Sequence, residues 1–422
     1  MKTMLYHKLI TLSISCKVLV RKLHNNVIHS LTRKRISYSS LMQLPQYKSN
    51  SNYLDKKNYR INKIPPVLSK CLNDVNPIFG EKVLEHYLSL NEKDSDPYLI
   101  NDNISDQFAT LIKDDLLENM CYVIELNPGY GLLTKRLLEA GVSFIHLYEN
   151  HNVFYQELQS LKAMFPNRVN ITQANLLRIS KMLNLNSISD TPNEHVCELF
   201  SNVPKRKWEE KSCMQIIGTV TKYAFMRHLI ISVIFQTSFM MHGRTIFYLA
   251  ISPSIWNKLT RHSERSPTFY TMFNILFNFT MFGALDRQGF LPWEQMKRSR
   301  TKKVISKEDI ELFYVVKLEP KSDLLSLFGG REQLIYFWHF IRYCLYRPSS
   351  RIIPTLEKII PGFGLRLIKK DYNIFTQFNE LSINQIIDIY TEFKTYPGFN
   401  ESSFLTSGND IRRVYDPYME AE

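Results

Sequence analysis

The sequence predicts an α/β fold in which a mostly parallel sheet is followed by a small helical domain. Two observations predict the sheet: short apolar runs recur and end in polar residues, and the first run leads through a glycine turn into a helical pattern. Beyond Pro320 the apolar spacing becomes helical, which predicts the second domain. With 422 residues, 44% of them hydrophobic, the chain is long enough for two or three domains.

The first predicted strand is joined to its helix by a glycine turn. Cys121 to Glu125 is an apolar run closed by an acidic residue, and the turn Asn127 to Gly131 leads into a helical run from Leu132 to Ala140. Gly129 and Gly131 allow the backbone to approach a ligand, and the free N–H groups of a helix N-terminus favour a carboxylate or phosphate. Alone, such a turn is as often a plain connection between a strand and a helix.

Three further strands are predicted after this unit. The run from Phe144 to Tyr148 is followed by Glu149, whose carboxylate is suited to accept two ribose hydroxyls. A strand from Val169 to Ala174 is followed by Asn175, and a fourth is predicted over residues 197–201. The loop Asn202-Val203-Pro204-Lys205 follows the fourth run. We expect Glu149 and Asn202 to lie around one cavity, because parallel strands end at one edge of a sheet.

Together these motifs resemble the rRNA adenine dimethyltransferase family. The resemblance rests on Glu125-x-Asn-Pro-Gly-x-Gly-x-Leu-Thr, on Glu149 and Asn175, and on Asn202-x-Pro. It covers about residues 95–420 and is strongest over 121–204. Within the family the chain is most similar to the mitochondrial transcription factor B group, second paralogue. The resemblance implies an S-adenosylmethionine-dependent methyltransferase (Rossmann-like) sheet with a small C-terminal helical domain.

The resemblance implies S-adenosylmethionine as cofactor and gives each residue at the pocket a role. Gly129 and Gly131 would approach the methionine moiety, with Glu125 nearby. Glu149 would hold the ribose. Asn175 stands where the family carries Asp, and its carbonyl oxygen would accept the adenine amino group.

The family's catalytic loop has the pattern Asn-x-Pro-aromatic. The Asn side chain and a backbone carbonyl accept the hydrogens of the adenine amino group, and the aromatic ring stacks on the flipped base. Asn202 and Pro204 keep the pattern as catalytic residues, but Lys205 replaces the aromatic residue. Asp96-Pro97 likewise replaces a Gln-Asn pair that closes over the cofactor in the family. For Asn202, the alternative is a loop residue that bonds its own backbone.

Basic residues cluster near this predicted site. A run of charge is usually a solvated face, but clusters on the expected ligand face favour contacts with nucleic-acid phosphates. We expect such contacts from Lys205, Arg206, Lys207, Lys297, Arg298, Arg300, Lys302 and Lys303. A third cluster is formed by Arg342, Arg347 and Arg351 in the helical domain.

Patterns elsewhere complete the predicted fold. The expected helices cover 104–117, 218–237, 254–259, 331–346, 352–360 and 383–393, and the expected strands cover 246–251 and 313–318. The last strand is antiparallel by family expectation. Aromatic residues within 268–279 are interpreted as core rather than as platforms for stacking bases. The domain boundaries are 1–40 for a transit peptide, 41–94 for a linker, 95–320 for the α/β domain, and 321–422 for the helical domain and tail.

The N-terminal region has the composition of a mitochondrial transit peptide. Residues 1–54 hold nine Lys or Arg and no Asp or Glu, which leaves only four of the thirteen net positive charges for the rest of the chain. A disordered basic arm that touches nucleic acid is the alternative. The six cysteines form no Cys-x-x-Cys pair, so neither a disulfide framework nor a metal site is expected. No apolar run is long enough to span a membrane.

Two functions remain open at this stage. In the first, the chain is a transcription initiation factor that joins the mitochondrial RNA polymerase in the matrix nucleoid and stabilises melted promoter DNA. In the second, it is a dimethyltransferase that acts on two adenines of small-subunit rRNA. The resemblance permits both in one protein, with methyl transfer residual, and nothing in the sequence requires more than a monomer.

Overall fold

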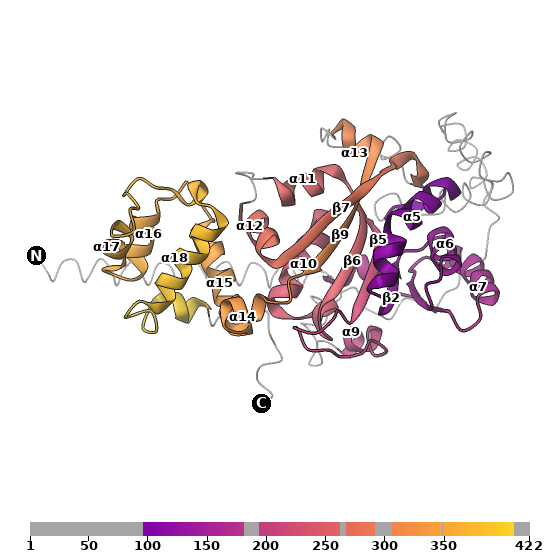
Figure 1. The fold of residues 1–422 in the computed structure, drawn as a ribbon, viewed down its shortest axis with the longest axis horizontal. Helices are drawn as coiled ribbons and strands as arrows, with labels where there is room; N and C mark the ends of the chain where they lie inside the picture. Colours follow the sequence, from indigo (N-terminus) through magenta and orange to yellow (C-terminus); the bar gives the residue numbers. More distant parts are fainter. Residues whose placement is uncertain (1–95, 181–193, 262–266, 292–305, 348, 409–422) are drawn as a thin grey trace, which may run out of the picture. The chain divides into compact units, whose positions relative to one another are not determined.

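A seven-stranded sheet forms the centre of the fold. The computed structural model describes residues 96–180, 194–261, 267–291, 306–347 and 349–408. The strand order is β4-β3-β2-β5-β6-β9-β7, and the labels β7, β9, β6, β5 and β2 follow one another across the sheet in Figure 1. These strands are β2 (Tyr122–Leu126), β3 (Ile145–Tyr148), β4 (Val169–Thr172), β5 (Met214–Val220), β6 (Thr245–Ile251), β7 (Phe277–Asp286) and β9 (Leu312–Pro320).

The first five strands of the sheet are parallel and the last two are antiparallel. The pairs β3–β4, β2–β3, β2–β5 and β5–β6 are parallel, whereas β9 runs antiparallel to both β6 and β7. The antiparallel closing strand is therefore confirmed. Every residue of β5 and β6 is buried, as expected for strands covered on both faces. The fold is the α/β, Rossmann-like methyltransferase fold that the resemblance implies.

Helices cover both faces of the sheet. One apolar core contains residues of α5, α6 and α7 packed against β2, β3 and β6, and Figure 1 shows these helices on one side of the sheet. The other contains residues of α10, α11 and α12 together with the C-terminal helices. The helices on the sheet are α5 (Asp102–Glu118), α6 (Leu132–Glu139), α7 (Tyr155–Met164), α9 (Glu194–Leu199), α10 (Tyr223–Phe235), α11 (Pro253–Thr260), α12 (Pro267–Leu276) and α13 (Lys307–Glu311).

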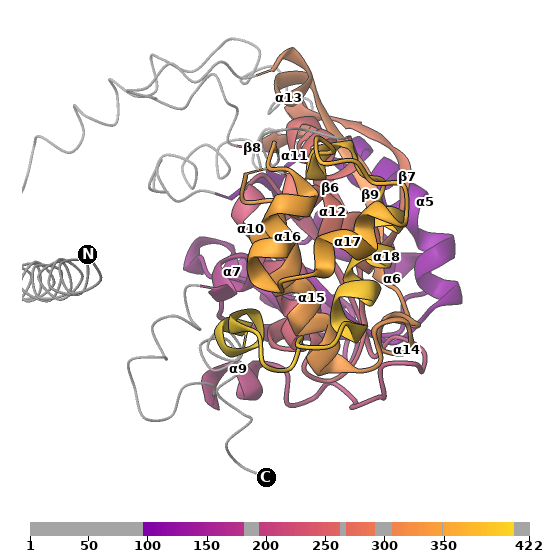
Figure 2. The same cartoon turned by 90° about the vertical axis from the view of Figure 1, so that its left-hand side faces the viewer.

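The C-terminal part of the described chain is helical, and Figure 2 looks onto it. Its helices are α14 (Leu324–Phe328), α15 (Arg331–Cys344), α16 (Ile352–Ile359), α17 (Phe363–Ile368) and α18 (Ile383–Thr395). α15 packs against α10 and α12. Ser382 caps α18 in a capping box with Gln385, as its sequence predicts. Among the described helices, none is long and apolar enough to cross a membrane.

The predicted fourth strand at Cys197 to Ser201 is wrong. Residues up to Leu199 belong to α9, in which Cys197 is exposed. The strand beside β2 is instead β5, which pairs Met214 with Tyr122. A central parallel strand must bury every residue, and Met214 to Val220 meets that requirement, whereas the earlier run does not. The helix expected from residue 218 therefore begins only at Tyr223.

A buried arginine ties the amino edge of the sheet together. The Arg244 guanidinium donates to the backbone oxygens of Trp208, Glu210 and Pro320 at 2.7–3.0 Å. It also donates to Glu319 Oε1 at 2.9 Å. Because Arg244 is only 7% exposed, removing the guanidinium would take away four hydrogen bonds that water cannot readily replace.

We predict that Arg244→Lys destabilises the fold by about 3 kcal/mol, because one ammonium cannot replace the planar fork of donors. The midpoint of urea-induced unfolding measures the effect. The control is Arg366→Lys, whose Nε lies 2.6 Å from Glu392 Oε2 in a more exposed pair, with side chains 42% and 22% exposed. The control should cost less than about 1 kcal/mol. Equal midpoints for the two variants would contradict the prediction.

Candidate functional site

The carboxyl ends of β2 and β3 form the candidate site. Glu149 follows β3, and its Oε2 atom accepts a hydrogen bond from the Gly129 N–H at 3.1 Å. Gly129 belongs to the turn between β2 and α6, so the two connections are joined directly. Asn175 follows β4 at the same edge and precedes the 3₁₀ helix Leu176–Arg178. The structure thus brings together the ends of three neighbouring parallel strands.

Glu149 is buried, and both of its oxygens are engaged by the backbone. Oε1 accepts from the His151 N–H at 2.8 Å, while Oε2 accepts from Gly129. Burial raises the pKa of Glu149 to about 7, and the backbone hydrogen bonds from His151 and Gly129 oppose this shift. The Asn150 N–H and the Tyr98 hydroxyl also donate to this carboxylate. A ribose hydroxyl would therefore take the place of the Tyr98 hydroxyl as a donor to Glu149.

Glu125 lies in the same region but is directed at the helix. Its Oε2 accepts a hydrogen bond from Thr134 Oγ1 on α6 at 2.6 Å. Burial raises the pKa of Glu125 to about 7, the Thr134 hydrogen bond lowers it, and the nearby Glu149 carboxylate raises it. Glu125 thereby fixes the first turn of α6 to β2 beneath the glycine turn.

The turn after β2 requires glycine at two positions. Gly129 has φ +58° and Gly131 has φ +70°, values that L side chains rarely adopt. A Cβ atom on Gly129 would lie 2.8 Å from Cδ1 of Tyr98, and one on Gly131 would lie 2.7 Å from Cδ2 of Leu161. Asn127 also has a positive φ, of 50°, which Asn tolerates better than most residues.

Among the described residues, several buried polar atoms of this edge have no hydrogen-bond partner. They are the side-chain oxygen and nitrogen of Asn127 and Oδ1 of Asn175. Buried polar atoms are usually paired, so unpaired ones at one edge indicate a missing ligand or water. An acceptor at Asn175 and the carboxylate of Glu149 match the adenine amino group and the ribose hydroxyls of a nucleoside cofactor. The residues present therefore fit such a group.

Asn202 does not belong to this site. Its neighbour Val203 accepts a hydrogen bond through its carbonyl from His242 Nδ1 at 2.9 Å, and the Arg206 N–H donates to the His242 carbonyl at 2.8 Å. His242 precedes β6, so this segment lies at the amino edge of the sheet. The amino and carboxyl edges are separated by the length of a strand. For β6, with seven residues, this is about 23 Å at ~3.3 Å per residue, so Asn202 lies at the edge opposite to Glu149.

The prediction of one cavity around Glu149 and Asn202 is therefore wrong. The catalytic and basic residues predicted from that loop lie at the amino edge, away from Glu149. They are Asn202, Pro204, Lys205, Arg206 and Lys207. The cause is the misplaced fourth strand, since the loop precedes β5 rather than following it. The second basic cluster, Lys297, Arg298, Arg300, Lys302 and Lys303, lies outside the described residues.

The loop that leaves the carboxyl end of β5 is the segment that the sequence reasoning missed. It consists of Thr221 and Lys222, between Val220 at the end of β5 and Tyr223 at the start of α10. The resemblance places an Asn-x-Pro-aromatic loop after the strand beside β2, and the residues from Thr219 to Lys222 include no Asn, Pro or aromatic residue. The continuous apolar run from Met214 could have located this strand. Lys222 donates a hydrogen bond to Asp96, the first residue of the described chain.

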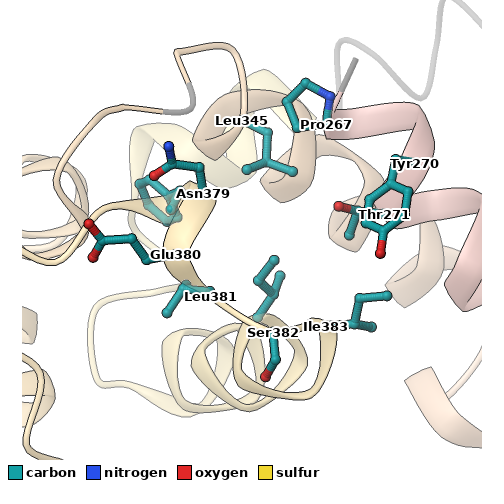
Figure 3. A pocket seen from close by; sticks show the side chains of 11 residues that line it. Pro267, Tyr270, Thr271, Leu345, Asn379, Glu380, Leu381, Ser382 and Ile383 are labelled. Atoms are coloured by element: carbon teal, nitrogen blue, oxygen red, sulfur yellow. The ribbon is translucent and has the colours of Figure 1, made fainter. Parts of the chain in front are cut away.

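A cavity of 390 Å³ lies elsewhere in the described chain. Figure 3 shows Tyr270 and Thr271 of α12 on one side of it and Leu381, Ser382 and Ile383, at the start of α18, on the other. It shares no lining residue with the edge around Glu149. Within the described ranges, no group of three or more His, Cys, Asp or Glu side chains is arranged to hold a metal ion.

Comparisons with known proteins identify relatives of the chain. It is 30% identical to dimethyladenosine transferase 2, mitochondrial, of Drosophila melanogaster over 75% of this chain and 80% of that protein. It is 21% identical to the Bos taurus protein of the same name, over 71% and 74%. No family model matches the chain.

Solved structures similar to the chain include two methyltransferases. The 23S rRNA methyltransferase ErmE is 12% identical with a TM-score of 0.44, over 71% of this chain and 100% of that one. A dimethyladenosine transferase from Plasmodium falciparum is 14% identical with a TM-score of 0.45, over 70% and 97%. The identity to the Drosophila protein over most of both sequences establishes the relationship, and the chain belongs to the rRNA adenine dimethyltransferase family.

Proposed function

We propose that this protein is a mitochondrial transcription initiation factor with the fold of an rRNA adenine dimethyltransferase, in which methyl transfer is weak or lost. It joins the mitochondrial RNA polymerase and stabilises the melted strand of promoter DNA. The observation that carries the proposal is the end of β5 and the loop after it. The residues from Thr219 to Lys222 include no Asn, Pro or aromatic residue of the kind that captures an adenine in the family.

The chemistry of adenine methylation explains why this loop is decisive. The lone pair of the amino group is delocalised into the ring, so the enzyme must accept both amino hydrogens and hold the base flipped. Lys222 has no aromatic face, and stacking is worth roughly 1–3 kcal/mol per base, or about ten- to a hundredfold in base capture. Thr219 offers a single hydroxyl instead of a planar amide.

The mitochondrial assignment draws on two independent features. The relatives in Drosophila and Bos are both named as mitochondrial proteins. The first 54 residues are basic, free of Asp and Glu, and thus typical of a transit peptide. We place the protein in the matrix nucleoid, because that is where it would encounter promoter DNA and the mitochondrial RNA polymerase.

A specific observation supports the second function, dimethylation of small-subunit rRNA. The acceptors for S-adenosylmethionine remain, because Glu149 is held by two backbone N–H groups and Asn175 Oδ1 is unpaired. A retained cofactor pocket is compatible with residual transfer. When bound, the cofactor would supply an electrophilic methyl group, while Glu149, Asn175 and the glycine turn would only hold it.

We predict that transcription from a duplex mitochondrial promoter by the matching polymerase depends on this protein. Premelting the promoter should remove most of the dependence, because the protein acts on strand opening. Run-off transcription with and without the full chain is the measurement. Equal output from the duplex promoter in both reactions would overturn the proposal.

We further predict that transfer of labelled methyl groups to the small-subunit rRNA hairpin is at or near background. Combining Thr219→Asn with Thr221→Pro and Lys222→Tyr should raise it at least tenfold, since these changes supply the amide and the stacking ring. Asn202→Ala is the control and should change neither methyl transfer nor promoter-dependent transcription. Strong transfer by the unaltered protein, or its loss on Asn202→Ala, would contradict this assignment.

Cofactor affinity should depend on pH through Glu149. Because its pKa is raised to about 7, the carboxyl is largely ionised at pH 8 and largely protonated at pH 6. Protonation removes an acceptor for the ribose, so the affinity for S-adenosylhomocysteine should fall about tenfold from pH 8 to pH 6. Calorimetric titration measures this. Glu149→Gln should bind weakly and without the pH dependence, and an unchanged profile in that variant would argue against the role of Glu149.

A further inference from the structure

Three segments meet at one buried carboxylate beside the candidate site. The Asp96 side chain is only 3% exposed. Lys222 donates a hydrogen bond to its Oδ1 atom, and Arg178 Nε lies 3.9 Å from its Oδ2 atom. Asp96 therefore sits between two cations that belong to different connections of the sheet.

The strand order shows what this ion cluster crosses. Arg178 belongs to the 3₁₀ helix after β4, and Lys222 follows β5. In the order β4-β3-β2-β5, these strands are three places apart, or about 14 Å at ~4.8 Å per strand. Arg178 and Lys222 reach one carboxylate from either side, so Asp96 bridges the ends of β3 and β2. Those ends carry Glu149 and the glycine turn.

The residues that follow Asp96 are fixed over the same edge. Tyr98 packs against Gly129 and lies 4.6 Å, between ring centroids, from Phe154. Tyr98–Leu99 forms β1, which pairs antiparallel with β8 (Phe290–Leu291). The Ile100 N–H donates to the Gly289 carbonyl at 2.9 Å. We call residues 96–100 the strap. It is held at one end by ions and at the other by strand pairing.

We infer that Asp96, Lys222 and Arg178 form a latch that keeps the strap closed over the cofactor site and slows release of the bound nucleoside cofactor. Lys222 lies in the loop after β5, where the resemblance would place the base-capturing loop, and Asp96 occupies the position expected to carry Gln in the family's lid. Two departures from the family pattern, 126 residues apart in sequence, are thus partners in one ion pair. The inference rests on the proposed function, since a latch of this kind suits a site that keeps its cofactor without transferring the methyl group.

The latch makes Lys222 a positioning residue, and its removal should speed cofactor release. An ion pair with one buried partner contributes more than a fully exposed pair, because losing the cation leaves the buried carboxylate poorly compensated. In the full chain, Lys222→Met should raise the dissociation rate of S-adenosylhomocysteine about tenfold. Lys222→Arg should restore slow release because it keeps the charge. High salt should accelerate release from the unaltered protein and have little effect on Lys222→Met.

A matched control exists on α6. Lys135 is 44% exposed, against 43% for Lys222, and pairs with Glu139 at 4.0 Å on the helix surface. Lys135→Met removes the same charge and should leave the dissociation rate unchanged. A rate for Lys222→Met equal to that of the unaltered protein, or equal rates for Lys222→Met and Lys222→Arg, would overturn the latch.

Hydrogen exchange tests the latch without cofactor or nucleic acid. The Ile100 amide reports on the strap, and the Lys321 amide, bonded to the Leu276 carbonyl at 2.9 Å, reports on another part of the fold. Lys222→Met and Asp96→Asn should each speed exchange at Ile100 about tenfold and leave Lys321 unchanged. Unchanged exchange at Ile100 in both variants would refute the latch. Because this readout needs neither promoter nor rRNA, it separates failure of the latch from failure of the proposed function.

Discussion

The hydrogen bond from the Gly129 N–H to Glu149 is the constraint on which the site depends. It joins the turn after β2 to the end of β3, and the left-handed conformation of Gly129 makes it possible. Because Gly129 has no side chain, Tyr98 packs directly against it, and this contact holds the strap across the sheet edge. Burial of the carboxylate follows from the same packing and raises its pKa. The cofactor side of the site is thus organised by the protein alone.

The two edges of the sheet differ in role: the contacts at the amino edge are structural, and the candidate site lies at the carboxyl edge. At the amino edge, Arg244 donates to carbonyls of the loop that precedes β5 and to the carbonyl of Pro320, the last residue of β9. The segment around Val203 is bonded to His242 at the same edge. These contacts are structural, and they explain why an Asn-x-Pro sequence near residue 202 is not a catalytic loop. At the carboxyl edge, Lys222 is paired with Asp96. The proposed loss of base capture is therefore compatible with membership of the family.

Only the parts of the site that depend on neighbouring residues are predictable from the sequence. The glycine turn and Glu149 are such parts, because each directly follows a strand that is recognisable from its own apolar residues. The fourth strand was misplaced, because a short apolar segment in α9 resembles a strand, and only pairing with β2 selects Met214 to Val220. The contact between Lys222 and Asp96 spans 126 residues, so no sequence periodicity could indicate it. The position of the fourth strand and the Lys222–Asp96 contact both depend on tertiary pairing, which local propensity does not predict.

The central claim is that this edge holds a nucleoside cofactor under a closed strap while Lys222 stays paired with Asp96 and does not give way to a base. A crystal structure of the full chain with S-adenosylhomocysteine and a single-stranded oligonucleotide tests it most directly. The account predicts ribose hydroxyls on Glu149, the adenine amino group of the cofactor on Asn175 Oδ1, and Lys222 still bonded to Asp96. A flipped adenine beside the loop after β5, with Lys222 displaced from Asp96, would contradict it.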